Sequence, residues 1–172
     1  VAARFAQAGR RAVEALVNET IANNAAFLIV AGDIFDGDWK DVATGLFFVR
    51  AISELHRRGI PVFMVRGNHD ADSLMSRELP YPETVRHFSS SKAETIALDD
   101  FKVALHGRSF PKRLTSADFV STYPMRREGW VNIGVLHTAL GGHAAHASYA
   151  PCTPAELQAL GYGYWALGHV HE

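Results

Sequence analysis

The sequence predicts an α/β fold built around a parallel sheet. Three features indicate it: short apolar runs that end near glycines, a helical pattern between two of these runs, and polar residues directly after each run. A strand, a helix and a second strand at this spacing form a βαβ unit, which places two parallel strands in one sheet. The length of 172 residues is that of one domain, so we assign residues 1–172 to a single domain.

The first half of the chain alternates helix and strand. Apolar residues at roughly helical spacing predict an amphipathic helix over residues 2–24. The continuous apolar run 27–31 predicts a buried strand. A second helical pattern covers residues 46–58 and stops at Gly59, and residues 61–65 form the next buried strand. These elements make up the βαβ unit.

The second half is richer in strands. Residues 95–98 and 101–105 flank two aspartates, which suggests a hairpin. An apolar strand follows over residues 131–136, and a short helix over 154–160 begins after a capping threonine, with proline at its first position. Residues 164–167 form the final predicted strand. We therefore expect both a parallel and an antiparallel strand pairing.

Composition limits the classes of function. Seventeen Lys and Arg against eighteen Asp and Glu leave a net charge of -1, so no global basic field recruits nucleic acid. The single cysteine, Cys152, excludes an internal disulfide framework and a cysteine-rich zinc site. No apolar run reaches the roughly 18–20 residues that cross a bilayer, so we expect no membrane partner. Nine histidines are an unusually large supply of metal ligands and general acids.

Side chains that can bind metal follow four of the predicted strands. Because the carboxyl ends of parallel strands line one crevice, these side chains should meet there. They are Asp33, Asn68, His137, His169 and His171. In an extended chain the imidazoles of His169 and His171 point to the same side, so both reach one centre. One carboxylate, one amide and three imidazoles suit manganese, iron or zinc.

Each motif alone also has a structural interpretation. Gly32 to Asp36 is equally consistent with a turn or a helix cap, and His169 and His171 with a pair of surface histidines. Asn68-His69-Asp70 directly after a buried strand has no obvious packing purpose. All four motifs in this order, each at a strand end, favour a metal site.

In this order the motifs resemble the signature of the calcineurin-like metallophosphoesterases. The matching segments are Gly32 to Asp36, Gly67 to Asp70, His137, and Gly168 to His171. The resemblance implies a metallophosphoesterase-type mixed β-sandwich flanked by helices, with the layer order α-β-β-α. Residues 31–39 and 164–169 are more specifically similar to bacterial DNA repair exonucleases of the SbcD and YhaO type.

The resemblance also implies two divalent metal ions. Manganese is expected first, with iron, zinc and magnesium as alternatives. Asp33 would bridge the two ions, which lie about 3.5–4 Å apart in such centres. The coordination of one ion would be completed by Asn68, His137 and His169, and His171 would bind the other ion.

The same resemblance assigns roles in catalysis. His69 would protonate the leaving oxygen, with Asp70 orienting its ring, while a metal-activated hydroxide attacks phosphorus. Asp36 would either support the ligands from behind or serve as a structural cap. Candidate substrate contacts are His106, at a strand end, and Arg108, in a small basic and aromatic cluster that is equally consistent with a solvated loop.

One family motif, D-x-H, does not occur in the sequence. It should lie on a strand just before the helix at residues 2–24, and the family continues beyond the Gly-His-x-His motif. We therefore expect an incomplete domain, truncated at both ends, in which one metal site is impaired. Such a chain would bind one ion well at most, with weak or absent nuclease activity.

The expected function is that of a metal-dependent phosphodiesterase acting on DNA, an exonuclease-type repair enzyme. One alternative is another phosphoesterase of the same superfamily: a protein phosphatase, a cyclic-nucleotide phosphodiesterase or a nucleotide pyrophosphatase. A second is a catalytically dead interaction scaffold with the same fold. Expected partners are DNA, a coiled-coil ATPase subunit and a second copy of the chain, and the expected location is the cytoplasm.

Overall fold

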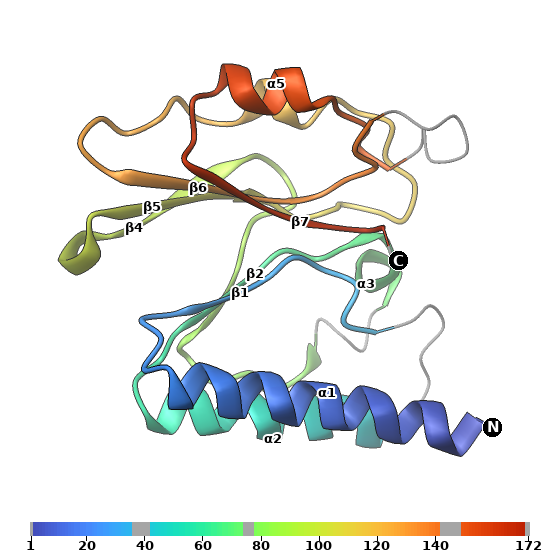
Figure 1. Ribbon diagram of the computed structural model, residues 1–172. Helices are drawn as coiled ribbons and strands as arrows, with labels where there is room; N and C mark the ends of the chain where they lie inside the picture. The colour runs from blue at the N-terminus through green and yellow to red at the C-terminus, as the bar shows by residue number, and fades with distance from the viewer. Residues whose placement is uncertain (1, 36–41, 74–77, 142–148, 171–172) are drawn as a thin grey trace. The chain divides into compact units, whose positions relative to one another are not determined.

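Residues 2–35, 42–73, 78–141 and 149–170 are described by the structure, a computed structural model. The chain divides into two units (Figure 1). The first comprises Val1–Ile29, Trp39–Phe63 and Leu74–Arg86. The second comprises Val30–Asp38, Met64–Ser73 and His87–Glu172.

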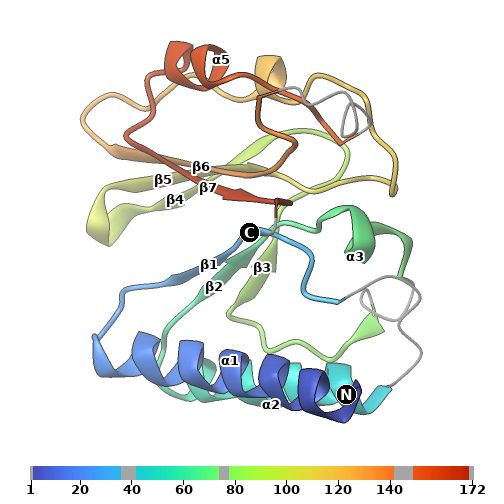
Figure 2. The same ribbon diagram turned by 45° about the vertical axis from the view of Figure 1, so that its right-hand side comes forward.

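Two helices, α1 (Ala2–Ala22) and α2 (Val42–Arg57), lie side by side in the first unit (Figures 1 and 2). The guanidinium of Arg10 on α1 lies over the ring of Phe47 on α2, 5.2 Å from its centroid. The buried residues of α2 recur at helical spacing: Gly45, Phe48, Val49, Ile52 and Leu55. Both predicted helices are confirmed, although α2 begins at Val42 rather than at residue 46.

The first sheet has the strand order β1-β2-β3, with β1 at Leu28–Val30, β2 at Val62–Met64 and β3 at Val85–His87. The amide of Leu28 donates to the carbonyl of Pro61, and that of Val65 donates to the carbonyl of Val30. These bonds advance along both chains in the same direction, so β1 and β2 are parallel, as predicted. All three strands begin in the first unit and end in the second.

The burial of β1 differs from the prediction. Its three residues are only half-buried, whereas those of β2 are fully buried. The order of the sheet explains the difference, because β1 forms an edge and β2 lies between two neighbours. A continuous apolar run does not distinguish a central strand from an edge strand.

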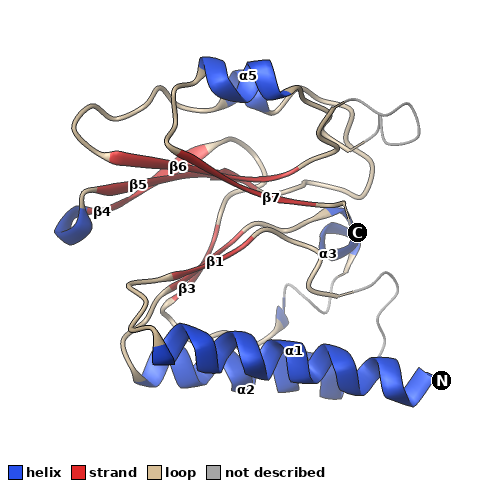
Figure 3. Ribbon diagram, viewed as in Figure 1, coloured by secondary structure: helices blue, strands red, loops and turns tan. Residues whose placement is uncertain are grey.

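The second sheet has four strands in the order β4-β5-β6-β7 (Figure 3). They are β4 (Glu94–Leu98), β5 (Val103–Arg108), β6 (Val131–His137) and β7 (Tyr164–Gly168). The predicted hairpin is confirmed: β4 and β5 are antiparallel and joined by the short helix η1 (Asp99–Phe101). The pairs β5-β6 and β6-β7 are parallel, and His137 pairs with Gly168. The carboxyl ends of β6 and β7 therefore lie at the same edge.

Helix α5 (Pro154–Ala159) lies over one face of this sheet (Figure 1). As predicted, Thr153 caps it, accepting a hydrogen bond from the amide of Glu156. Short η2 (Val120–Thr122) and α3 (Asn68–Asp72) complete the second unit. Its apolar core includes Phe110, Phe119, Tyr123, Leu136 and Leu157.

Two sheets flanked by helices confirm the predicted α/β class and are consistent with the architecture that the resemblance implies. Among the helices that the structure describes, none is long and apolar enough to cross a bilayer.

Candidate metal centre

The carboxyl ends of four strands bring four predicted ligands together within the second unit. The ligand atoms of Asp33, His137 and His169 all lie within 4.8 Å of one another. The side-chain oxygen of Asn68 lies 2.9 Å from Nε2 of His137 and 3.1 Å from Nδ1 of His169. Asn68 and His137 are buried, and Asp33 has a side-chain exposure of 8%. We call these four residues the metal cluster.

The orientation of His137 shows which of its ring atoms faces the cluster. Its Nδ1 donates to the carbonyl of Ala31 at 2.9 Å. Nε2 therefore faces the cluster, 2.9 Å from the oxygen of Asn68 and 3.2 Å from Oδ2 of Asp33. This backbone contact from the other ring nitrogen is how proteins usually fix a metal-binding histidine.

This convergence of oxygen and nitrogen atoms requires either a proton or a cation between them. Three buried acceptor atoms facing one another without a donor would repel, at a cost of several kcal/mol. A proton on Nε2 or a cation among the atoms removes the repulsion. The spacing also fits a cation, because neighbouring ligands in an octahedron are about 3.0 Å apart when each lies about 2.1 Å from the ion. The residues present therefore fit a divalent metal.

Two of the predicted ligands lie in strained backbone conformations. Asp33 has φ +54° and His169 has φ +111°, a region that side-chain-bearing residues rarely adopt. Such conformations persist only where surrounding contacts hold them, and they concentrate at functional sites.

Asp70 supplies the contacts that hold the turn at Asp33. Its carboxylate accepts the amide of Asp33 at 2.7 Å, that of Gly67 at 3.1 Å and that of Phe35 at 3.3 Å. In return, Oδ1 of Asp33 accepts the amide of His69 at 3.0 Å. The turns after β1 and β2 are thus tied together by two carboxylates through backbone amides.

The two carboxylates differ in pKa. Burial raises the pKa of Asp33, but hydrogen bonding and charge from His137, with the amide of His69, outweigh it and leave the pKa below its usual value. Burial raises the pKa of Asp70 above its usual value, only partly opposed by its amide donors. Asp33 is accordingly ionised, as its predicted role as a ligand requires, and Asp70 holds the turn through backbone amides.

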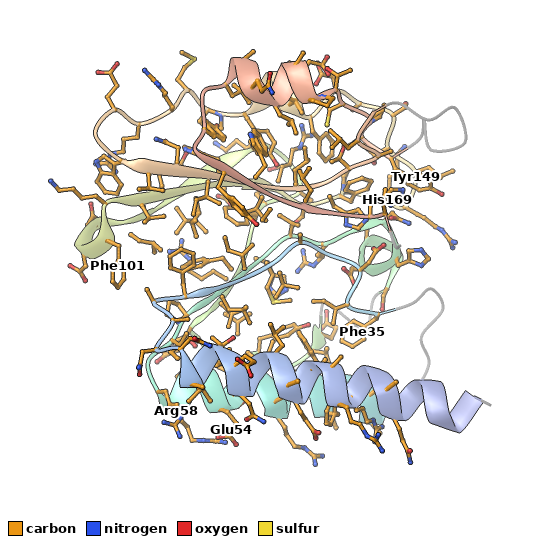
Figure 4. The ribbon with its side chains drawn as sticks, viewed as in Figure 1. Phe35, Glu54, Arg58, Phe101, Tyr149 and His169 are labelled. Atoms are coloured by element: carbon orange, nitrogen blue, oxygen red, sulfur yellow. The ribbon has the colours of Figure 1, made fainter. Side chains whose placement is uncertain are left out.

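Aromatic contacts hold His169. Its ring lies edge-on to that of His137, with centroids 5.1 Å apart. On another side it packs against Tyr149 at 4.7 Å, and Figure 4 shows the two side chains together. No spacing rule relates Tyr149 to this cluster, so sequence reasoning assigned it no site role.

Other predicted site residues have different outcomes. His69 is half-buried at the start of α3, one residue after Asn68. Asp36 and His171 lie outside the described residues. The predicted cluster therefore has five potential ligands, four of which the structure brings together.

His106 is not at a cleft rim, contrary to the prediction. It is 1% exposed, and its ring nitrogens bond Oγ1 of Thr95 at 2.8 Å and Oδ1 of Asn132 at 2.9 Å. Its ring also stacks on Tyr162, with centroids 4.4 Å apart. A histidine so enclosed in the sheet offers no surface to a substrate.

The side chain of Arg108 contacts residues of neighbouring loops. Its guanidinium lies over the ring of Phe119 at 4.1 Å, and it donates to the carbonyl of Ser91 and the hydroxyl of Thr122, both at 3.3 Å. The side chain is only half-buried, so its predicted contact with substrate stays a prediction.

Comparison with known proteins agrees with this geometry. The calcineurin-like phosphoesterase family model matches residues 6–172. The chain is 29% identical over 175 residues to the metallophosphoesterase YhaO of Bacillus subtilis (strain 168), covering 99% of this chain and 42% of the relative. It is 27% identical over 176 residues to the DNA double-strand break repair protein Mre11 of Methanopyrus kandleri, covering 92% of this chain and 38% of the relative.

The chain thus spans less than half the length of either relative. The family match extends over nearly all of the chain and includes every residue of the metal cluster. The chain belongs to the calcineurin-like phosphoesterase family.

Proposed function

We propose that the protein is a metal-dependent phosphodiesterase that hydrolyses DNA, of the exonuclease type used in DNA repair. The observation that carries the proposal is the convergence of Asp33, Asn68, His137 and His169, whose oxygen and nitrogen atoms lie at distances that fit a divalent cation. A divalent ion bound there supplies Lewis-acid activation of water and neutralises charge on the phosphoryl oxygens.

The chain's own residues divide the remaining work. The four residues of the metal cluster hold the ion, and Ala31 fixes His137 through its Nδ1–H. His69 donates a proton to the leaving oxygen as the phosphodiester bond breaks. Its backbone amide donates to Asp33 at 3.0 Å, which places the residue beside the metal cluster. His171 as a further ligand and Asp36 as a support complete the proposal.

DNA is proposed as the substrate from the relatives. One is a metallophosphoesterase that matches 99% of the chain, and the other is named as a DNA double-strand break repair protein. The net charge of -1 gives DNA no general attraction, so local cations must contact its phosphates. A coiled-coil ATPase and a second copy of the chain are proposed partners, in the cytoplasm.

The test is hydrolysis of two substrates, linear DNA and bis(4-nitrophenyl) phosphate, in the presence of manganese, by a chain extended with the D-x-H motif that this sequence lacks. The proposal expects cleavage of both, lost in His137→Ala. Cleavage of the small diester alone would overturn the DNA assignment and favour another phosphoesterase of this family. Tight metal binding with no hydrolysis of either would favour the interaction scaffold. The His137→Ala variant controls for contaminating nucleases.

A further inference from the structure

A concave site lies at the opposite end of β6 and β7 from the metal cluster. It has a volume of about 560 Å³ and is lined by residues of the two loops that enter these strands, among them Arg126, Arg127, Trp130 and Gly161. Its volume is within the range of small-molecule sites, about 300–1,000 Å³. Six residues of extended chain separate Val131 from His137, which is about 20 Å. The cleft is therefore separate from the metal cluster.

A tight turn forms one wall of this cleft. The amide of Trp130 donates to the carbonyl of Arg127 at 3.3 Å, and Gly129 in the turn has φ +75°. Arg127 and Trp130 thus lie at the two ends of the turn, on the same side. The guanidinium of Arg127 lies over the indole of Trp130, 3.5 Å from the ring centroid. Arg127 is exposed, so the stacked pair presents a flat, cationic surface.

A buried network holds this turn in place. The side-chain nitrogen of Asn132 donates to the carbonyls of Arg127 and Trp130, both at 2.9 Å. Its oxygen accepts the amide of Arg127 at 2.7 Å. Because these backbone partners fix the amide orientation, Nε2 of His106 is the donor to the same oxygen. Asn132 and His106 are 5% and 1% exposed, so the turn is preorganised from within the sheet.

The opposite wall carries a second cation. The side chain of Arg126 passes over Gly161, where an added β-carbon would lie 3.4 Å from Cδ of Arg126. Two arginines against the single Glu128 make the lining net positive. The flat guanidinium of Arg127 and the positive charge of Arg126 together match a ligand that is flat at one end and anionic at the other.

We propose that this cleft binds a nucleoside phosphate, with the base stacked on Arg127 and the phosphate paired with Arg126. Stacking on a guanidinium plane is one way in which proteins hold unpaired bases, and arginine pairs with phosphate oxygens in a planar, two-point geometry. An acidic peptide would use the charges but not the flat surface, so the Arg127–Trp130 pair favours a nucleotide. The ligand is either a free mononucleotide or an unpaired nucleotide of a strand. The inference is independent of the metal cluster and of the proposed hydrolysis.

The test is binding of a 3′-fluorescein-labelled single-stranded oligonucleotide, followed by fluorescence anisotropy in EDTA, where metal-dependent cleavage cannot occur. Adenosine 5′-monophosphate is the competitor that distinguishes the two sources. We expect Arg127→Ala and Trp130→Ala to weaken binding about tenfold, the loss of one stacked base. Arg58→Ala is the matched control, because it removes the same charge from an exposed site on the first unit.

Competition by the mononucleotide would assign the cleft to free nucleotides, and binding of the oligonucleotide alone would assign it to a strand. Equal weakening by Arg58→Ala and Arg127→Ala would overturn the proposal, because it would show diffuse attraction. Absence of saturable binding, or equal competition by a glutamate peptide, would overturn it too.

Discussion

Gly168 lies so close to the backbone carbonyl of Ala31 that a β-carbon on Gly168 would overlap the carbonyl oxygen. The same oxygen accepts the Nδ1–H of His137. One carbonyl group therefore sets both the approach of β7 to the turn after β1 and the orientation of a metal-cluster histidine. The glycine before His169 is required by this contact, whatever the identity of the metal.

Gly168→Ala is expected to damage the metal cluster. The added β-carbon would displace Ala31 and approach Nδ1 of His137, so manganese affinity should fall about 10–100-fold. Gly9→Ala is the control, because nothing lies within 4 Å of its added β-carbon in α1. That control should stabilise the fold by about 0.5–1 kcal/mol. Calorimetric titration and thermal unfolding would measure both, and identical behaviour of the two variants would contradict the packing argument.

His137→Ala is expected to abolish tight manganese binding. The substitution removes Nε2, which faces both Asn68 and Asp33. Loss of a residue that only supports a metal ligand lowers metal affinity about 10–100-fold, so loss of a ligand should lower it at least as much. We expect the unmodified chain to bind one ion tightly in calorimetric titration, since the described donors form one cluster. His56→Ala, at a histidine bonded to Thr84 in the first unit, should bind as the parent does. Two tight sites in the parent chain would refute the stoichiometry.

His69→Ala is expected to separate metal binding from turnover. Its backbone amide donates to Asp33, so loss of the imidazole leaves that contact in place. Manganese affinity should be unchanged, while kcat for bis(4-nitrophenyl) phosphate should fall about 10²–10⁴-fold, as for loss of a general acid. If the ion is lost as well, His69 has a structural or ligand role instead.

His87 is expected to make stability depend on pH. Burial and the charge of Arg66 lower its pKa from 6.5 to about 4. The unfolded chain then binds the proton more readily, so stability falls as pH drops from about 6.5 towards about 4, by about 3 kcal/mol in total. Urea unfolding at pH 7 and at pH 4.5 should show a smaller difference for His87→Gln than for the parent. An equal difference in both proteins would exclude His87 as the source.

Local sequence patterns were sufficient where an element is determined by its own residues. The apolar spacing of α2 and the Thr153 cap of α5 are such signals, and both elements form as predicted. The short α3 was not predicted, because Asp70 within it is held by the amides of Asp33 and Phe35, more than thirty residues away. Strand β3 has only three residues, too few for a sequence pattern to predict it, so its pairing with β2 determines it.

The candidate site shows the same division. A strand end followed by a polar residue located Asp33, Asn68, His137 and His169, because parallel strands deliver their carboxyl ends to one edge. His106 also stands near a strand end, yet Asn132 and Thr95 enclose it. Whether a histidine at such a position faces a crevice or the sheet interior depends on its cross-strand neighbours, which a single sequence does not place.

The left-handed backbone at Asp33 and His169 implies that selection for function opposes selection for thermostability at these two positions. Glycine would relax the backbone at either one, and glycine at position 33 would also remove a buried carboxylate from the facing acceptors. Inactive variants at these positions can therefore melt at higher temperatures than the parent. A screen that ranks variants by melting temperature alone would enrich proteins that have lost their metal ligands, so such a screen needs a metal-binding assay beside it.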